Sequence, residues 1–522
     1  MLRLIAVIFA GLLTACAIQP AAPAFDILIL NGTVYDGSLG PGRKHNIGIS
    51  GTRIVSVDAP NDAMARTVID ADGKLVVPGF IDPHTHAAID PQDTAATAHI
   101  NHLTQGVTTL VVGSDGRGVV DRAATFSQLE EQGVGANIAF FAGHGGIRKT
   151  VLGYADRAPT ESELRTMVSL LETEMRDGAL GLSTGLFYAP GSYSDTGEVV
   201  ALAKAAARAD GIYDTHLRDE GSNTVGLIAA VEEAILIARQ AGIPVHISHI
   251  KALGKDVWGQ SRKVVELIEN ARRAGLEITA NQYPWEASGT RISNALIPRW
   301  VMADSEQHRD ARLRNPQQLP AIREEMRQNL ARRGGPDAIL VTAVSSPYLG
   351  KTLAEIAAAM QLDAVDAAIE VVIGGDPSVA SFVMHQDDID LFATQPWVMT
   401  GSDGGVGHPR FYATYPKTWQ DFVVKRKLLS IEQFVHRSSG QVADTLGLCD
   451  RGHIRLGQAA DIAVIDAENF LPAANYDRPA ELSTGIDHLL VNGSVVIRDG
   501  RYQERRAGII LRGKASFEIL CR

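Results

Sequence analysis

The chain has 522 residues, which is too many for one ordinary hydrophobic core and enough for a large barrel with a smaller domain. Its hydrophobic fraction of 45% and charged fraction of 21% are typical of a globular protein. A net charge of -11 argues against a nucleic-acid-binding function, because phosphate binding requires clustered Lys and Arg side chains.

Residues 1–15 have the pattern of an export signal. Arg3 gives a positive start, and residues 4–13 are an apolar run too short to cross a bilayer as a helix. The small residues before Cys16 resemble a bacterial lipoprotein signal, which implies that Cys16 becomes the acylated first residue of the mature chain. Residues 16–24 would then form a short tether. An uncleaved N-terminal anchor is the alternative.

This resemblance predicts an exported bacterial lipoprotein whose only membrane contact is its N-terminal lipid anchor. Where lipoproteins are sorted by the residue after the acylated cysteine, Ala17 favours the outer membrane, facing the periplasm. The remaining cysteines, Cys449 and Cys521, could pair in such an oxidising compartment. Spacing alone does not establish their contact, so we assign them no function.

Short apolar runs separated by Gly, Asn and Asp predict β-strands near both ends of the chain. An Asn-Gly dipeptide at position 31 and another at position 492 each precede such a run. Because Asn-Gly adopts positive φ at little cost, both are strong hairpin signals. We therefore expect one small β-sandwich domain assembled from residues 25–77 and 452–512, followed by a tail over residues 513–522.

Residues 78–451 alternate strand-like runs with helical patterns. The eight strand candidates are 79–86, 107–115, 138–145, 180–186, 211–218, 244–251, 276–283 and 397–404. Eight such units predict an α/β fold of the (β/α)8 TIM-like barrel type. Two further strand-like runs, 339–344 and 382–384, disturb the count. The Arg- and Glu-rich stretch 285–336 is interpreted as an inserted lid over the barrel mouth.

Polar residues close several of these predicted strands, where the site of such a barrel is built. His84 and His86 end the first strand, and their i, i+2 spacing directs both imidazoles to one face. His216 ends the fifth strand, His249 the sixth and Asp403 the eighth. Four histidines and an aspartate at one mouth predict a transition-metal site.

Motifs around these residues resemble a known family. VPGFID at 77–82, followed by HTH at 84–86, is similar to the opening of the amidohydrolase superfamily. The remaining motifs are similar to those of D-aminoacylases (N-acyl-D-amino-acid deacylases): GLSTGL at 181–186, THLRDE at 215–220, ISHIK at 247–251, GSDG at 401–404 and HPR at 408–410. The resemblance extends from about residue 25 to residue 512.

One position departs from the family pattern. The resemblance implies a cysteine metal ligand after the second strand, and this chain has Asp115 there. Because a carboxylate can also ligate or bridge metal ions, the simplest interpretation is replacement of one ligand by another. The alternative is that Asp115 only caps a loop and that the metal site is impaired.

The resemblance implies a divalent metal cofactor, zinc, in one tight site and a second, weaker one. The tight site would be held by His216, His249 and Asp115. The second would be held by His84, His86 and Asp403. A metal at such a centre acidifies water and polarises the scissile carbonyl. Because a carboxylate is a harder ligand than a thiolate, Asp115 predicts that Mn or Co is also accepted.

Asp403 is the predicted general base, which takes a proton from water and passes it to the leaving amine. A strand-end cap is the other interpretation of this residue. The sequence gives no role for Glu220 or His385.

An N-acyl amino acid carries a free α-carboxylate, which needs cationic partners. Lys251 shares a face with His249, and Arg410 can bind a carboxylate through two parallel hydrogen bonds. The resemblance places both in the substrate pocket, with hydroxyl donors from Tyr283 and Tyr188. Taken alone, each of these residues is more often a solvated surface charge or a packing tyrosine. His144 is a substrate contact or a structural residue.

The sequence therefore predicts metal-dependent hydrolysis of N-acyl-D-amino acids to a D-amino acid and a carboxylate. The alternatives are a dipeptidase that releases C-terminal D-residues and a cyclic-amide hydrolase. Lys251 and Arg410 argue against the cyclic amide, which lacks a free carboxylate. A non-catalytic binding lipoprotein is a third alternative, against which Asp403 argues because binding needs no general base.

Overall fold

The computed structural model describes residues 24–118 and 122–515. The predicted signal over residues 1–15, Cys16 with nearly all of the tether, and Cys521 lie outside the described residues. Within the described ranges, no helix is long and apolar enough to cross a membrane.

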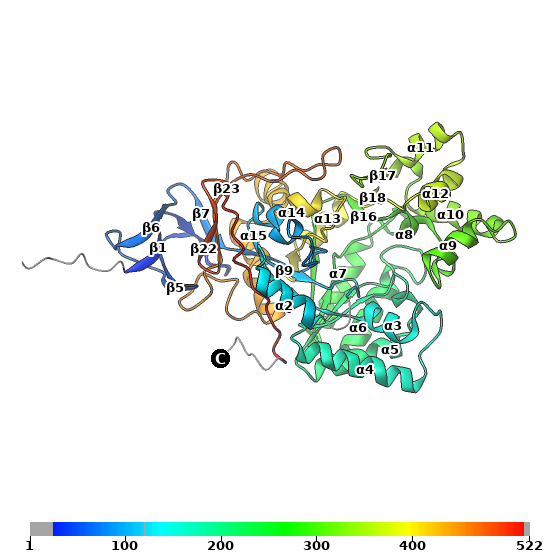
Figure 1. Cartoon of the computed structure of the whole chain (residues 1–522), viewed down its shortest axis with the longest axis horizontal. Coiled ribbons are helices and arrows are strands. Elements are labelled where there is room, and N and C mark those ends of the chain that lie inside the picture. Colours follow the sequence, from blue (N-terminus) through cyan, green and yellow to red (C-terminus); the bar gives the residue numbers. More distant parts are fainter. Residues whose placement is uncertain (1–23, 119–121, 516–522) are drawn as a thin grey trace, which may run out of the picture.

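Both chain ends contribute to one β domain, coloured blue and red-brown in Figure 1. Its first sheet has the order β5-β4-β1-β6, and its second has the order β23-β22-β21-β20-β7-β2-β3. The strands are β1 (Phe25–Leu30), β2 (Thr33–Val34), β3 (Arg43–Lys44), β4 (Ile47–Ser50), β5 (Arg53–Ser56), β6 (Ala65–Asp70), β7 (Leu75–Pro78), β20 (Ile462–Ile465), β21 (Ile486–Val491), β22 (Ser494–Arg498) and β23 (Arg501–Tyr502). Mostly branched aliphatic side chains from both ends fill the core. The two-ended β domain predicted from the sequence is confirmed.

The pairing of β7 with β20 joins the two ends. Val76 lies opposite Val464 in antiparallel register, and both are fully buried. At the end of β7, the Gly79 N–H donates a hydrogen bond to the Asp461 carbonyl oxygen at 2.8 Å. We call the pairing of β7 with β20 the seam. Since the first barrel strand begins at the next residue, Phe80, the seam fixes where that strand enters the barrel.

Parallel strands form the barrel. One sheet has the order β10-β9-β8 and another the order β11-β12-β13-β14-β15-β19. The strands are β8 (Phe80–Asp82), β9 (Val107–Val112), β10 (Asn137–Phe140), β11 (Ala142–Gly143), β12 (Gly181–Gly185), β13 (Ile212–His216), β14 (Val245–Ile247), β15 (Ile278–Gln282) and β19 (Val398–Thr400). A parallel bridge between Thr85 and Gly404 connects the first and last positions. Because β10 and β11 lie within one predicted strand, the described strands occupy the eight predicted positions, and the barrel is confirmed.

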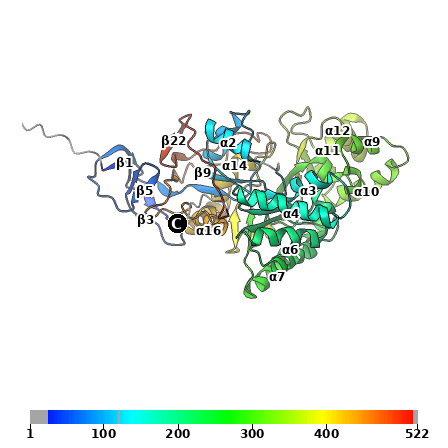
Figure 2. The same ribbon diagram turned by 60° about the horizontal axis from the view of Figure 1, so that its bottom comes forward.

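Amphipathic helices cover the outside of the barrel. Figure 2 shows α4 (Glu161–Arg176), α6 (Leu227–Ala241) and α7 (Ser261–Arg273) along one side. In α4 the buried side chains Met167, Leu171 and Met175 recur every four residues, which is one face of a helix. The α4 N-terminus is closed by a capping box between Thr160 and Glu163.

An inserted unit lies beside the barrel and is longer than the 285–336 stretch that the sequence suggested. It begins at β16 and ends at β18, so the predicted end falls too early. The unit contains β16 (Ala287–Arg291), α8 (Ile292–Leu296), α9 (Glu306–Leu313), α10 (Leu319–Arg332), β17 (Ile339–Val341), α11 (Leu353–Met360), α12 (Ala364–Ile373) and β18 (Ser378–Phe382). The extra run 339–344 begins with β17, whereas the run 382–384 shares only its first residue with β18. Both β17 and β16 pair with β18 and not with the barrel. The unit has a hydrophobic core of its own.

Candidate metal centre

The strand ends bring the six predicted metal ligands to one place. In parallel strands the carboxyl ends meet at the same edge, so side chains that follow them converge. His216 is the last residue of β13, and the others lie in the loops directly after β8, β9, β14 and β19. Two groups with nitrogen and oxygen atoms suited to a metal result, and Asp115 belongs to both. One group is His84, His86, Asp115 and Asp403, and the other is Asp115, His216 and His249.

Asp115 lies between the two groups. Its Oδ1 is 3.4 Å from His84 Nε2, 3.4 Å from His216 Nδ1 and 3.2 Å from His249 Nε2. Its Oδ2 is 3.3 Å from His86 Nε2. The carboxylate therefore lies within reach of histidines of both groups, through Oδ1 to His84, His216 and His249 and through Oδ2 to His86. This geometry supports the ligand interpretation of Asp115 over the loop-cap alternative.

Asp403 belongs to the first group and lies in the loop after β19, the last strand of the barrel. Its Oδ1 is 3.6 Å from His84 Nε2 and 3.4 Å from His86 Nε2. Its Oδ2 is 2.8 Å from Arg410 Nη1. One oxygen therefore faces the histidines while the other is held by a guanidinium.

The residues present fit a metal ion. Both ring nitrogens of His84 and the Nε2 of His216 are buried without a hydrogen-bond partner in the described structure. Such atoms are costly unless something binds them. The backbones of Asp115, His249 and Asp403 have φ values of 58°, 35° and 46°, and strain of this kind persists at functional sites. Imidazole and carboxylate donors suit zinc, manganese and cobalt.

The aspartates of the centre are held in the charged form that a metal requires. Burial alone would raise the pKa of Asp115, but the neighbouring histidines, His84 first, hold that pKa well below its usual value. Burial has the same effect on Asp403, where Arg410 and His249 outweigh it and hold the pKa well below the usual range. Both side chains are therefore carboxylates at neutral pH.

Glu220 is a part of the site to which the sequence gave no role. It accepts a hydrogen bond from Lys251 Nζ at 2.6 Å and lies 3.0 Å from His249 Nδ1. Its other oxygen is 3.6 Å from His216 Nε2. A carboxylate behind a ligating histidine orients the ring and raises its basicity. Glu220 lies four residues after His216, in the loop that follows β13, and this spacing could have identified it in the sequence.

The predicted substrate residues have different surroundings. Lys251 is buried and paired with Glu220, and it lines a small, nearly filled void instead of the open mouth. Tyr283 lines the same small void, and its buried hydroxyl has no partner among the described residues. The Arg410 guanidinium, which borders the mouth cavity, lies 4.7 Å from the Tyr283 ring. The Tyr188 ring is 4.7 Å from that of His216.

His144 lies apart from this arrangement. It begins α3 (His144–Leu152), and its Nε2 is 2.8 Å from Glu198, which also pairs with Arg148. All three side chains are buried, and His144 does not line the mouth cavity. These contacts support the structural alternative for His144.

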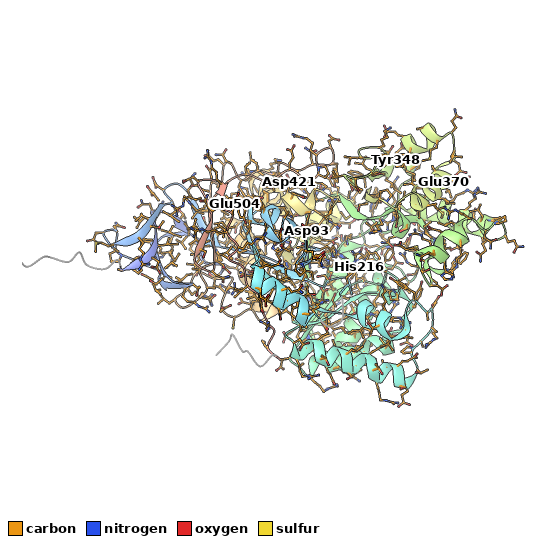
Figure 3. All side chains as sticks on the ribbon, in the orientation of Figure 1. Asp93, His216, Tyr348, Glu370, Asp421 and Glu504 are labelled. Atoms are coloured by element: carbon orange, nitrogen blue, oxygen red, sulfur yellow. The ribbon has the colours of Figure 1, made fainter. Side chains whose placement is uncertain are left out.

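A cavity of about 570 Å³ opens over the centre. The barrel contributes His86, Asp115, Tyr188, Asp403 and Arg410 to its wall, and the inserted unit contributes residues of β16, β18 and the loop after β17. In Figure 3 His216 lies within the barrel, and the labelled Tyr348 and Glu370 belong to the inserted unit at its side. The inserted unit therefore forms part of the mouth.

Removing the Asp115 carboxylate tests its position between the groups. Asp115→Ala is expected to weaken metal binding at both groups, whereas Asp115→Cys retains binding and shifts it toward zinc, because a thiolate is the softer ligand. The measurement is the metal content of metal-free protein reconstituted with Zn, Mn and Co. If Asp115→Ala binds as much metal as the wild type, Asp115 is a turn residue and not a metal ligand.

Known proteins share the whole architecture. Residues 67–497 match the model of the amidohydrolase family. The chain is 30% identical over 521 residues to a D-aminoacylase of Alcaligenes xylosoxydans xylosoxydans, which covers 94% of this chain and 99% of that protein. It is also 30% identical to an N-acyl-D-glutamate deacylase of the same organism, over 94% of this chain and 97% of that protein.

Solved structures agree with these sequences. An N-acyl-D-glutamate deacylase of Bordetella bronchiseptica, complexed with zinc and a phosphonate inhibitor, matches with a TM-score of 0.80 and 29% identity over 94% of this chain and 99% of that chain. A D-aminoacylase whose binuclear metal centre is activated by one metal and attenuated by a second matches with a TM-score of 0.80 and 28% identity over 94% of this chain and 100% of that chain. Together with the donor geometry, these matches confirm a His/Asp centre able to hold two metal ions. The chain belongs to the D-aminoacylase (N-acyl-D-amino-acid deacylase) family of the amidohydrolase superfamily.

Proposed function

We propose that this protein hydrolyses the amide bond of N-acyl-D-amino acids and releases a D-amino acid and a carboxylate. The observation that carries the proposal is the shared cavity wall. His86, Asp115 and Asp403 of the centre border the same cavity as Arg410. The relatives named above support a D-amino acid product. Because they include enzymes for different side chains at equal identity, they leave the side chain open.

Asp403 has the position of the proton carrier. When bound, a metal ion at this centre supplies Lewis acidity, which activates water and polarises the amide carbonyl. Asp403 borders both the centre and the cavity, so its carboxylate can accept the proton of the attacking water and deliver it to the leaving nitrogen. Arg410, 2.8 Å away, holds this carboxylate in place.

Arg410 and Tyr283 are the proposed partners of the substrate α-carboxylate. The Nε of Arg410 and the Tyr283 hydroxyl are buried without hydrogen-bond partners in the described ranges, and Arg410 lines the cavity. A bound carboxylate would satisfy both. Lys251 instead supports His249 through its pair with Glu220, and we assign it a positioning role.

Replacing Arg410 separates carboxylate recognition from chemistry. Arg410→Met is expected to raise KM for an N-acyl-D-amino acid by about tenfold or more, because a charge-assisted bidentate contact is lost. KM for an analogue with a carboxamide in place of the carboxylate should change far less. Steady-state kinetics on both compounds give the comparison. The control is Lys425→Met, an exposed charge in the segment Trp419–Lys425, which directly follows the helix α14 (Arg410–Thr418) that Arg410 begins. Equal losses on both compounds would mean that Arg410 does not bind the carboxylate.

The function itself is tested with a substrate panel. Purified metal-loaded protein is assayed with D- and L-enantiomers of N-acetyl amino acids, with dipeptides that end in a D-residue and with cyclic amides. Faster turnover of the N-acetyl-D compounds supports the proposal. A preference for the dipeptides or the cyclic amides would replace it with one of the two alternatives, and absence of turnover on every compound would favour a binding protein.

We also propose that the protein is an exported lipoprotein, from the resemblance of residues 1–16 to a lipoprotein signal. Expression in a bacterium with a labelled fatty acid should label the wild-type chain and leave Cys16→Ala unlabelled, because the thiol is the acylation site. Fractionation of the same cells should place the wild type with the outer membrane. Label on Cys16→Ala would contradict the anchor.

A further inference from the structure

Asp214 is a fully buried carboxylate behind the metal centre. It lies in β13, two residues before His216, and its exposed fraction is 0%. Residues two apart in a strand have side chains on the same face, so Asp214 and His216 share a face of β13. Asp214 does not line the mouth cavity, so it acts through its neighbours in the barrel and not on a substrate.

A serine next to His249 binds one oxygen of this carboxylate. The Ser248 hydroxyl donates a hydrogen bond to Asp214 Oδ1 at 2.6 Å, and Ser248 directly precedes His249. The backbone of His249 has a φ of 35°, and such strain persists only where the surroundings fix it. Its own N–H donates to Asn281 Oδ1 at 2.8 Å. The contact between Ser248 and Asp214 fixes the chain one residue earlier.

A second serine connects Asp214 to the loop of Asp115. The Ser183 hydroxyl donates to Asp214 Oδ2 at 2.7 Å and accepts a hydrogen bond from the Gly116 N–H at 3.2 Å. Gly116 directly follows Asp115, whose φ is 58°. One carboxylate is therefore linked to the segments that carry all three ligands of one metal group, which we call the His216 group: Asp115, His216 and His249.

Asp82 has a similar arrangement in the other metal group, which we call the His84 group (His84, His86, Asp115 and Asp403). It is the last residue of β8, is fully buried and accepts a hydrogen bond from the His84 N–H at 3.3 Å. The Ser402 hydroxyl donates to Asp82 Oδ2, and the Ser402 N–H donates to Oδ1 at 3.0 Å. Ser402 directly precedes Asp403. Each group thus has a buried aspartate two residues before a histidine ligand and a serine beside another ligand.

We propose that Asp214 positions the ligands of the His216 group through its hydrogen bonds to two serines. Asp82 has the corresponding role in the His84 group. The inference concerns metal binding, so it does not depend on which amide the enzyme hydrolyses. Groups that orient metal ligands from outside are typically worth about 10- to 100-fold in metal affinity. A purely structural role would instead change only the free energy of unfolding.

The test is a zinc titration of the metal-free protein, with anomalous diffraction at the zinc edge to show which group each ion occupies. Asp214→Ala is expected to lower the zinc affinity of the His216 group by about tenfold or more, because both serine contacts are lost. Asp82→Ala should lower that of the His84 group by a similar factor and leave the His216 group within about threefold. Since Asp115 belongs to both groups, Asp214→Ala should lower both affinities, whereas Asp82→Ala should lower one.

Serine variants show whether Asp214 acts through its hydrogen bonds. Ser183→Ala and Ser248→Ala each remove one contact and should lower the zinc affinity of the His216 group by about threefold, and further in the double variant. Adding Asp214→Ala to the double variant should cause little further loss, since residues of one network have non-additive effects. Asp214→Asn should recover most of the wild-type affinity, because its amide can accept from one hydroxyl and donate to the other.

Asp376→Ala is the matched control for the loss of a buried carboxylate. Asp376 lies in the inserted unit and accepts hydrogen bonds from the Ser293 hydroxyl at 2.6 Å and the Ser293 N–H at 2.9 Å. Its removal should lower Tm, because buried donors lose their partner, and should leave both zinc affinities unchanged. Thermal unfolding of the metal-free variants gives this comparison.

Unchanged zinc affinity of the His216 group in Asp214→Ala, or in the double serine variant, would overturn the inference. An equal loss in Asp214→Ala and Asp376→Ala would also overturn it, because the cause would then be general damage to the fold. If Asp214→Ala does not fold, the double serine variant decides by the same measurement.

Discussion

His216→Ala is expected to abolish metal binding at its group and to lower turnover by more than about a hundredfold. Loss of a direct metal ligand should cost more than loss of a residue that only hydrogen-bonds to a ligand. His216 faces Asp115 through Nδ1 at 3.4 Å, while its Nε2 has no hydrogen-bond partner among the described residues. The measurement is metal content by mass spectrometry together with turnover of an N-acetyl-D-amino acid.

The matching control is His385→Ala, which removes a half-exposed imidazole that belongs to neither group of the centre and should change neither value. Circular dichroism should show that the barrel remains folded in both variants, since ligand loss leaves the hydrophobic core intact. Full metal occupancy with normal turnover in His216→Ala would remove His216 from the ligand set.

Asp403→Asn is expected to lower turnover by roughly a hundredfold or more while the tight metal ion is retained, because the amide keeps the shape but cannot accept a proton. The ion of the other group, held by Asp115, His216 and His249, does not depend on Asp403. Single-turnover kinetics with metal analysis separate the two effects. Turnover near that of the wild type would show that another group transfers the proton.

The barrel and its ligands could be predicted because strand ends have a fixed geometry. The order of the strands placed the segments that carry His84, His86, His216, His249 and Asp403 at one edge. The strands are shorter than the sequence suggested, so only His216 lies in a strand and the others follow strand ends. Asp115 was harder, since its position depends on a loop with a backbone φ of 58°. Its position between the two groups follows from that loop and not from any sequence period.

Pairing between charged side chains could not be predicted from the sequence. Lys251 and Arg410 were both expected to meet the substrate, yet Lys251 is paired with Glu220 and Arg410 with Asp403. A charge identifies the kind of partner it needs but not which of several carboxylates lies nearest. The end of the inserted unit was also missed, because the sequence does not show that β18 pairs with β16 and β17 and not with the barrel.

The seam between β7 and β20 has a consequence for how the chain acquires its structure. The residues on its two sides are separated by the entire barrel. The edge of β7 that faces β20 therefore stays unpaired during synthesis until the last part of the chain emerges, while β2 can pair with the other edge. An open edge of apolar strand is a template for aggregation. Closing a loop of this length also slows folding, since long-range pairings form late. The strand that leads directly to His84 is therefore secured only near the end of folding.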